Sequence, residues 1–224
     1  MKKIFLFLFI LSILLPDYVC SDEKTLKSLE AIEKKYAGLR DYTADVHVHF
    51  DIETFKTPDM EAKLYFKIPD KLKIESKKIF FFPKEGGFFN PAFFKKEDYE
   101  SRSVEEAATN RKELKLRIVP KKKDLMGREF ILVIDRDENL IREVHLSQVG
   151  GRETRAEIEY MKYDSFDLPK RIVLNLDIPS VEPNESIGFG PPEQKPKRIT
   201  GRIEITYSNY KINTGLKDDL FKTR

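Results

Sequence analysis

The sequence predicts an α+β fold that is mainly antiparallel β: a strongly curved sheet or open barrel preceded by one helix. From Thr43 to Ser76, apolar and polar residues alternate with a period of two, as they do in half-buried strands. Turns containing Pro and Asp interrupt this alternation twice, and connections this short leave no room for a crossover helix. Nearly every later segment repeats the alternation, so the strands are expected to curve around one apolar interior.

The N-terminus has the features of a cleaved export signal. Two lysines precede an apolar run from Ile4 to Leu15, and Pro16 ends the run. The run is too short to span a bilayer comfortably, since a membrane helix needs about 20 apolar residues. We therefore expect a signal peptide at residues 1–21, with a retained membrane anchor as the alternative.

Cys20 leaves a second kind of processing open, because it is the single cysteine of the chain and some bacterial export signals end in a lipidated cysteine. Such signals usually have a small residue just before the cysteine and an aliphatic residue three positions before it. This sequence has Val19 and Asp17 there. Val19 and Ser21 instead suit ordinary cleavage before Asp22. We expect a periplasmic protein, with a lipid anchor on Cys20 as the alternative.

Residues 22–224 are expected to form one domain. A domain of about 200 residues can bury a sufficient core without a metal or disulfide. The 41 basic and 38 acidic residues of the chain nearly balance, so charge gives no argument for nucleic-acid binding.

One amphipathic helix is predicted between Asp22 and Leu39, where Ser21 or Asp22 can cap its start and Gly38 marks its end. Its apolar face carries Leu26, Leu29, Ile32, Tyr36 and Leu39. The strands that follow present one apolar face, formed by Ala44, Val46, Val48, Phe50, Ile52, Met60, Ala62, Leu64, Phe66, Ile68, Leu72 and Ile74. We expect the helix to pack on these strands.

A segment rich in phenylalanine comes next. Phe80–Phe82 end a predicted strand, and Gly86-Gly87 and Asn90-Pro91 favour irregular backbone after it. That backbone carries Phe88, Phe89, Phe93 and Phe94. Leaving each ring in water costs about 1.5–3 kcal/mol relative to burial. We expect these four rings to form a lid or gate over an apolar cavity, with ordinary core packing as the alternative, and residues 99–114 to form a polar helix that carries the lid.

The rest of the chain is predicted to form strands joined by turns. Three strands are expected at LKLRIVP, REFILVID and LIREVHLSQ. The turn Asp135–Asn139 has the D-x-D-x-N spacing of a calcium loop but lacks the glycine and final glutamate of one, so it is a hairpin turn. Further strands are marked by alternating apolar residues around Ala156–Tyr160, Ile172–Ile178 and Ile199–Tyr207. A loop with five prolines separates the last two, from Pro179 to Lys197.

This order of elements resembles the LolA-like lipoprotein carrier superfamily. The residues that carry the resemblance are LYFKIPDKLKI, IFFFP and the long stretch from RIVPKKKDLMGREF to TRAEIEY, and the ending YKINTGLKDDLF is similar to outer-membrane lipoprotein-sorting proteins. The resemblance implies a half-open curved β-barrel with a helical lid, whose apolar interior holds lipoprotein acyl chains or membrane lipid. It also implies no enzymatic activity, no cofactor, and an inner-membrane donor and an outer-membrane acceptor as partner proteins.

The sequence departs from the carrier at one position. The carrier has an arginine just before the proline that follows its second strand, where it serves lid closure and cargo release. This chain has Ile68 there, and Lys67 one residue earlier belongs to the opposite face of the strand. We expect retention of an apolar cavity and passive exchange of lipid.

The alternation predicts which side chains line that cavity, because one face of every strand converges on it. The predicted lipid-binding residues are Phe50, Leu64, Phe66, Leu72, Ile74, Ile158, Leu174 and Ile203. A closed core filled by these same side chains is the alternative, since small barrels are often filled in this way.

The sequence offers little for catalysis. His47 and His49 share one face of a strand and with His145 have the chemistry of zinc ligands, but the same face carries Asp45, Asp51 and Glu53 and reads as solvated. The sequence has no G-x-S-x-G motif and no glycine-rich phosphate loop after a strand. Two functions remain: a periplasmic carrier of acyl chains, or a membrane-tethered lipid sensor or structural lipoprotein of the same fold, lipidated at Cys20.

Overall fold

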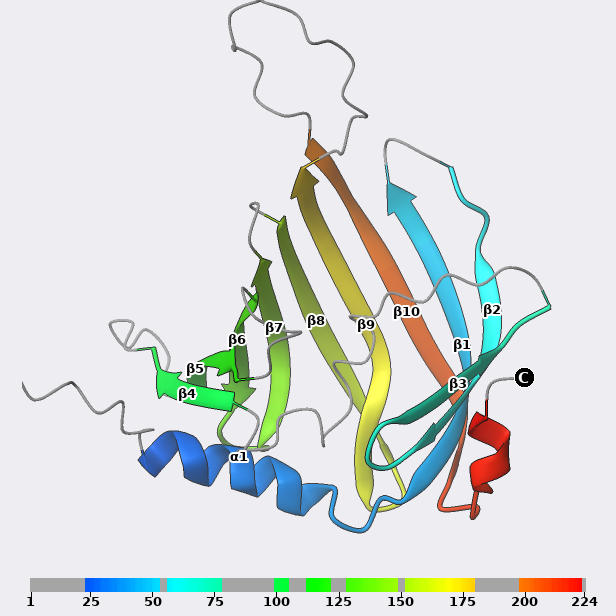
Figure 1. Cartoon of the computed structure of the whole chain (residues 1–224), viewed down its shortest axis with the longest axis horizontal. Helices are drawn as coiled ribbons and strands as arrows, with labels where there is room; N and C mark the ends of the chain where they lie inside the picture. The colour runs from blue at the N-terminus through cyan, green and yellow to red at the C-terminus, as the bar shows by residue number, and fades with distance from the viewer. Residues whose placement is uncertain are drawn as a thin grey trace, which may run out of the picture.

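The computed structural model describes residues 23–52, 56–77, 99–104, 112–121, 128–148, 152–179 and 198–222. Within these residues, ten strands form one antiparallel sheet that curves strongly, with the helix α1 across its lower end (Figure 1). The elements are α1 (Glu23–Lys35), β1 (Asp41–Ile52), β2 (Met60–Lys67), β3 (Lys71–Glu75), β4 (Tyr99–Ser103), β5 (Glu113–Pro120), β6 (Arg128–Asp135), β7 (Leu140–Gln148), β8 (Arg152–Tyr163), β9 (Phe166–Pro179), β10 (Arg198–Ile212) and the 3-10 helix η5 (Asp218–Phe221).

The sheet joins two meanders. Its spatial order is β3-β2-β1-β10-β9-β8-β7-β6-β5-β4, so pairing of β1 with β10 connects the first three strands to the last seven. β3 and β4 lie at the two edges, and the described sheet is therefore open. This is the half-open, mainly antiparallel architecture that the sequence predicts.

The inner face of the sheet, defined here by the side chains of Phe50, Ile203 and Leu174, is apolar across the strands. Cross-strand partners form one continuous row on it: Phe50, Ile203, Leu174, Ala156, Val144, Leu132 and Leu116. All seven are buried, with Phe50 the most exposed at 9%. A parallel row runs through Val48, Ile205, Ile172 and Ile158. Because full burial of such a side chain contributes about 1.5–3 kcal/mol, these rows are the main source of stability.

The helix α1 packs against the same core through Leu29 and Ile32. It ends at Lys35, before the predicted Gly38, because the next turn tightens: the N–H of Leu39 donates to the carbonyl of Tyr36 at 2.9 Å. Lys35 fixes this end of the helix, since its Nζ lies 2.7 Å from Asp167 Oδ2.

A buried carboxylate fastens the C-terminal segment over the outer face of β1. Asp41 is 3% exposed, and its carboxylate accepts hydrogen bonds from the N–H groups of Thr214, Gly215 and Leu216 at 2.8, 3.1 and 3.3 Å. The Asn213 side chain accepts from the N–H of Arg40 at 2.7 Å. These bonds give a structural reason for the N-T-G-L sequence near the end of the chain.

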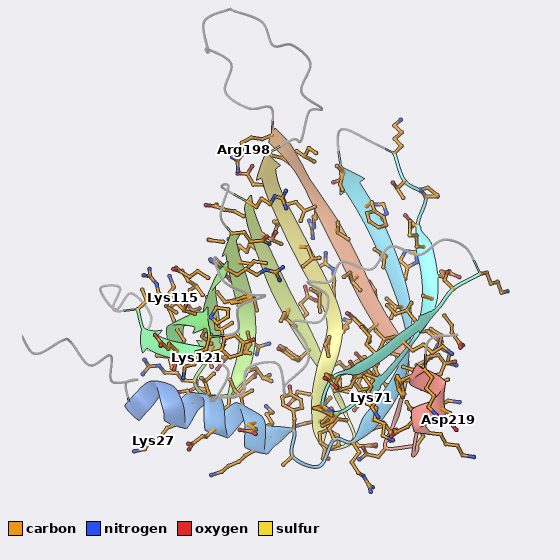
Figure 2. All side chains as sticks on the ribbon, in the orientation of Figure 1. Lys27, Lys71, Lys115, Lys121, Arg198 and Asp219 are labelled. Carbon is orange, nitrogen blue, oxygen red and sulfur yellow. The ribbon has the colours of Figure 1, made fainter. Side chains whose placement is uncertain are left out.

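The segment then reaches the edge of the sheet through η5. Lys67 and Lys71 bind the two carboxylate oxygens of Asp218 at 2.6 and 2.9 Å, and Figure 2 shows Lys71 beside this short helix. Hydrogen bonds from the two lysines lower the pKa of Asp218 to about 2.

The helix predicted over residues 99–114 is wrong at both ends of that range, and residues 105–111 lie outside the described residues. Tyr99–Ser103 is the edge strand β4, paired with β5, and β5 already begins at Glu113. Tyr99 and Ser101 are buried in this strand. Pairing with a neighbouring strand decides the conformation of such polar sequences more strongly than intrinsic propensity does.

Candidate lipid-binding face

The structure places all eight predicted cavity residues on the inner face. Six of them are buried: Phe50, Leu64, Phe66, Ile158, Leu174 and Ile203. The other two lie on the edge strand β3, where Leu72 is opposite Phe66 and Ile74 is opposite Leu64. Ile74 is half-buried, whereas Leu72 is 44% exposed. The apolar face therefore reaches solvent at this edge.

Whether these residues line a cavity stays a prediction. An open pocket of about 670 Å³ lies elsewhere, beside β2 beyond the end of β3, and its lining includes His47, Asp59, Lys63, Glu75 and Lys77. None of the eight predicted residues borders it. Val46, Met60 and Ala62 also line it, so its wall mixes charged and apolar side chains, whereas an acyl-chain site is predominantly apolar.

A cluster of aromatic rings occupies the end of the inner face next to α1. The ring of Tyr42 lies 5.1 Å from Phe66 and 5.5 Å from Tyr210, measured between ring centroids. Tyr210 also contacts Tyr163 at 4.6 Å and stacks on Tyr207 at 6.4 Å. We call Tyr42, Tyr163, Tyr207 and Tyr210 the tyrosine cluster. Burial raises the pKa of Tyr42, Tyr207 and Tyr210, so their hydroxyls stay neutral donors.

A β-bulge brings two of these rings together. The register between β1 and β10 shifts opposite Thr43 and Asp45, and Asn209 has a φ of 53°. Because the bulge inserts one residue, Tyr207 and Tyr210 face the same side although they are three positions apart. The Asn209 side chain stabilises it by donating to Asp45 Oδ2 at 2.8 Å. Strict alternation misses this cluster, and the signal that could have found it is Asn209 between closely spaced tyrosines.

Comparison with solved structures identifies the fold. One similar structure is an outer-membrane lipoprotein-sorting protein domain from Vibrio parahaemolyticus. It matches with a TM-score of 0.59 over 89% of this chain and 97% of its own, at 15% sequence identity. A LolA-superfamily protein from Nitrosomonas europaea matches with a TM-score of 0.58 over 87% of this chain and 97% of its own, at 12% identity. The chain has a LolA-like fold.

A third protein with this fold, a DUF1329-family member from Desulfovibrio piger, has a TM-score of 0.62 and 12% identity over 91% of this chain and 98% of its own. The chain matches no protein-family model and no curated protein. The likeness is therefore one of fold, and similarity of sequence adds nothing to it.

The position where the LolA-like carrier has its arginine is apolar in structure as well as in sequence. Ile68 is half-buried against the core, and its N–H donates to the carbonyl of Arg40 at 3.0 Å. Lys67 Nζ instead donates hydrogen bonds to the carbonyl of Leu216 at 2.7 Å and to the carboxylate of Asp218. Ile68 has no basic group, and that of Lys67 is already bound, so neither residue can supply the role of the carrier's arginine on the inner face.

The three histidines lie on the outer face, where His47 and His49 share one carboxylate and His145 lies apart from them. Asp59 bridges His47 Nε2 at 3.2 Å and His49 Nδ1 at 2.7 Å. The hydrogen bond to Asp59 raises the pKa of His49 and lowers that of Asp59. His145 lies on β7, separated from β1 by β8, β9 and β10, and pairs with Glu143 at 2.8 Å. The described ranges contain no cluster of three or more side chains suited to a metal ion.

Several sequence predictions fall outside the described residues. They include the signal peptide at residues 1–21, Cys20, the strand end at Phe80–Phe82, the gate of Phe88, Phe89, Phe93 and Phe94, and the proline-rich loop at residues 180–197. Among the described helices, none is long and apolar enough to cross a membrane.

Proposed function

We propose that residues 1–21 export the chain to the periplasm and that residues 22–224 form a single domain that binds acyl chains of lipids or lipoproteins. In this proposal the domain serves lipoprotein sorting or transport toward the outer membrane. The LolA-like fold supports it, as do the solved structures of this fold whose descriptions name lipoprotein sorting and the LolA superfamily. Its partners would be a donor at the inner membrane and an acceptor at the outer membrane.

The observation that carries the proposal is the apolar inner face, which is continuous from the core to Leu72 at an open edge. A 44% exposed leucine paired to buried Phe66 offers apolar surface on which an acyl chain would gain burial. In the part of the chain that the structure describes, the inner face carries rows of apolar side chains rather than paired acids, bases or nucleophiles. We therefore propose binding rather than catalysis.

A second function rests on Cys20. If this cysteine carries lipid, the protein is tethered to a membrane and acts as a sensor or structural lipoprotein, because a tethered domain cannot shuttle freely. Mass spectrometry of the protein extracted from its native envelope separates the two functions. A chain that begins at Asp22 supports the carrier, and a chain that begins at lipidated Cys20 supports the tethered form.

Substitution of matched exposed residues tests lipid binding itself. Leu72 on the inner face and Val119 on the outer face are similarly exposed, at 44% and 41%. Leu72→Asp should weaken binding of the apolar fluorophore N-phenyl-1-naphthylamine about tenfold, because a buried unpaired charge is costly. Val119→Asp should leave binding unchanged. Equal effects of the two variants, or no binding by the parent protein, would contradict the proposal.

A further inference from the structure

Two hydroxyls of the tyrosine cluster are buried and have no hydrogen-bond partner among the described residues. Tyr42 is 5% exposed and Tyr207 is 3% exposed. Within the described part of the chain, neither hydroxyl makes a hydrogen bond. Their neighbour Tyr210 does, donating to the carbonyl of Pro169 at 2.8 Å. The cluster thus contains both satisfied and unsatisfied phenols in the same surroundings.

An unpartnered buried hydroxyl is unfavourable, because it gives up its hydrogen bonds to water and gains none in return. A phenylalanine would fill the same space without this cost, as Phe66 does beside Tyr42. Two tyrosines that keep their hydroxyls here therefore suit a partner that is not part of the protein.

The two hydroxyl groups belong to one region of the inner face. Tyr42 on β1 and Tyr207 on β10 lie on adjacent strands, and both rings contact the ring of Tyr210. The surrounding side chains are apolar or aromatic. A ligand that reaches both hydroxyls must therefore be largely apolar and carry a hydrogen-bond acceptor.

We propose that the hydroxyls of Tyr42 and Tyr207 donate hydrogen bonds to the carbonyl oxygen of a bound acyl group. This inference rests on the proposed function and adds to it a polar subsite that orients the chain, with its carbonyl at the tyrosine cluster and its hydrocarbon along the inner face. A neutral ester carbonyl fits better than an ionised carboxylate. A buried carboxylate would need a cation, and Lys67 and Lys71, at this end of β2 and β3, bind Asp218 instead.

Displacement of N-phenyl-1-naphthylamine from the purified protein tests the subsite. Three competitors share a long alkyl chain: methyl palmitate has an ester carbonyl, palmitic acid has a carboxyl group, and hexadecane has neither. Tyr42→Phe and Tyr207→Phe should each weaken competition by methyl palmitate roughly threefold to tenfold, the loss of one neutral hydrogen bond. Competition by hexadecane should not change. A comparable loss for palmitic acid would contradict the preference for a neutral carbonyl.

Tyr210→Phe is the matched control, because its hydroxyl is already bonded to Pro169. Tyr210→Phe should lower the temperature of unfolding, and it should change competition by methyl palmitate no more than competition by hexadecane. Tyr42→Phe and Tyr207→Phe should instead unfold at the temperature of the parent protein or above it. If Tyr42→Phe and Tyr207→Phe bind all three competitors as the parent does, the subsite is wrong and lipid binding stands. If the parent protein binds neither reporter nor competitors, the proposed function fails together with the subsite.

Discussion

The two faces of the sheet are made by alternate residues of the same strands, yet different interactions hold them. The inner face is a set of apolar rows, in which Leu174 is fully buried between Ile203 and Ala156. The outer face is a network of solvated ion pairs. Arg171 donates two hydrogen bonds of 2.6 Å to Glu204 and one of 2.8 Å to Glu159.

The comparison teaches where stability and binding reside. Burial of apolar side chains contributes far more than exposed ion pairs, which are typically worth about 0–1 kcal/mol each. The inner face therefore holds the fold together, and the same apolar surface is available to a ligand where it reaches the open edge at Leu72. The outer face contributes solubility, except where the C-terminal segment covers Asp41.

Truncation of the inner-face row should have the largest effect. Leu174→Ala removes a fully buried side chain and should lower the free energy of unfolding by about 2–5 kcal/mol. Glu153→Ala, at an exposed position on the neighbouring strand β8, should change it by less than about 0.5 kcal/mol. Urea denaturation measures both variants, and similar midpoints would mean that the row is not the stabilising core.

Substitution of Asp41, which the C-terminal segment covers, should cause the second-largest loss of stability. Asp41→Ala leaves three backbone N–H groups of the C-terminal segment without their acceptor and should cost about 1–3 kcal/mol. Hydrogen exchange at Thr214, Gly215 and Leu216 should accelerate in the same variant. Unchanged exchange at these amides would show that the segment is held by other contacts.

The exposed ion pairs should matter less. Arg171→Met breaks the pairs with Glu204 and Glu159 and should lower stability by about 0.2–1 kcal/mol, because water and salt screen charges on this face. The difference from the parent protein should shrink at high salt. A loss as large as that of Leu174→Ala would overturn the distinction between the two faces.

The smallest change in stability should come from loss of the hydrogen bond between His49 and Asp59, and it should depend on pH. The pKa of His49 is raised above 6.5 by its hydrogen bond to Asp59, so the protonated form favours the folded state. This stabilisation is complete below pH 6.5 and disappears as pH rises through the folded-state pKa. His49→Gln should therefore lose stability against the parent at about pH 5.5 and match it at about pH 9. A constant difference across this range would exclude the linkage.

Much of the architecture follows from local patterns. Alternation at Thr43–Ser76 and in the later strands predicts each strand from β1 to β3 and from β5 to β10, and the Asp135–Asn139 turn forms as expected. The alternation also assigns all eight predicted lipid-binding residues to one face, the inner face of the sheet, because the side-chain period of a strand is two. The edge strand β4 was not predictable in this way, since its polar sequence has no periodic signal and pairing with β5 determines it.

What the sequence determined by itself was the class of fold and the apolar face of each strand, because both depend on spacing along the chain. Only the tertiary structure decided that β1 and β10 pair, how their register shifts, and which tyrosines meet across them. It also decided that Asp41 is buried beneath a segment more than 170 residues later in the chain. These contacts join residues that are distant in sequence. They contribute to stability only after folding of the sheet has brought those residues together, so local sequence patterns do not reveal them.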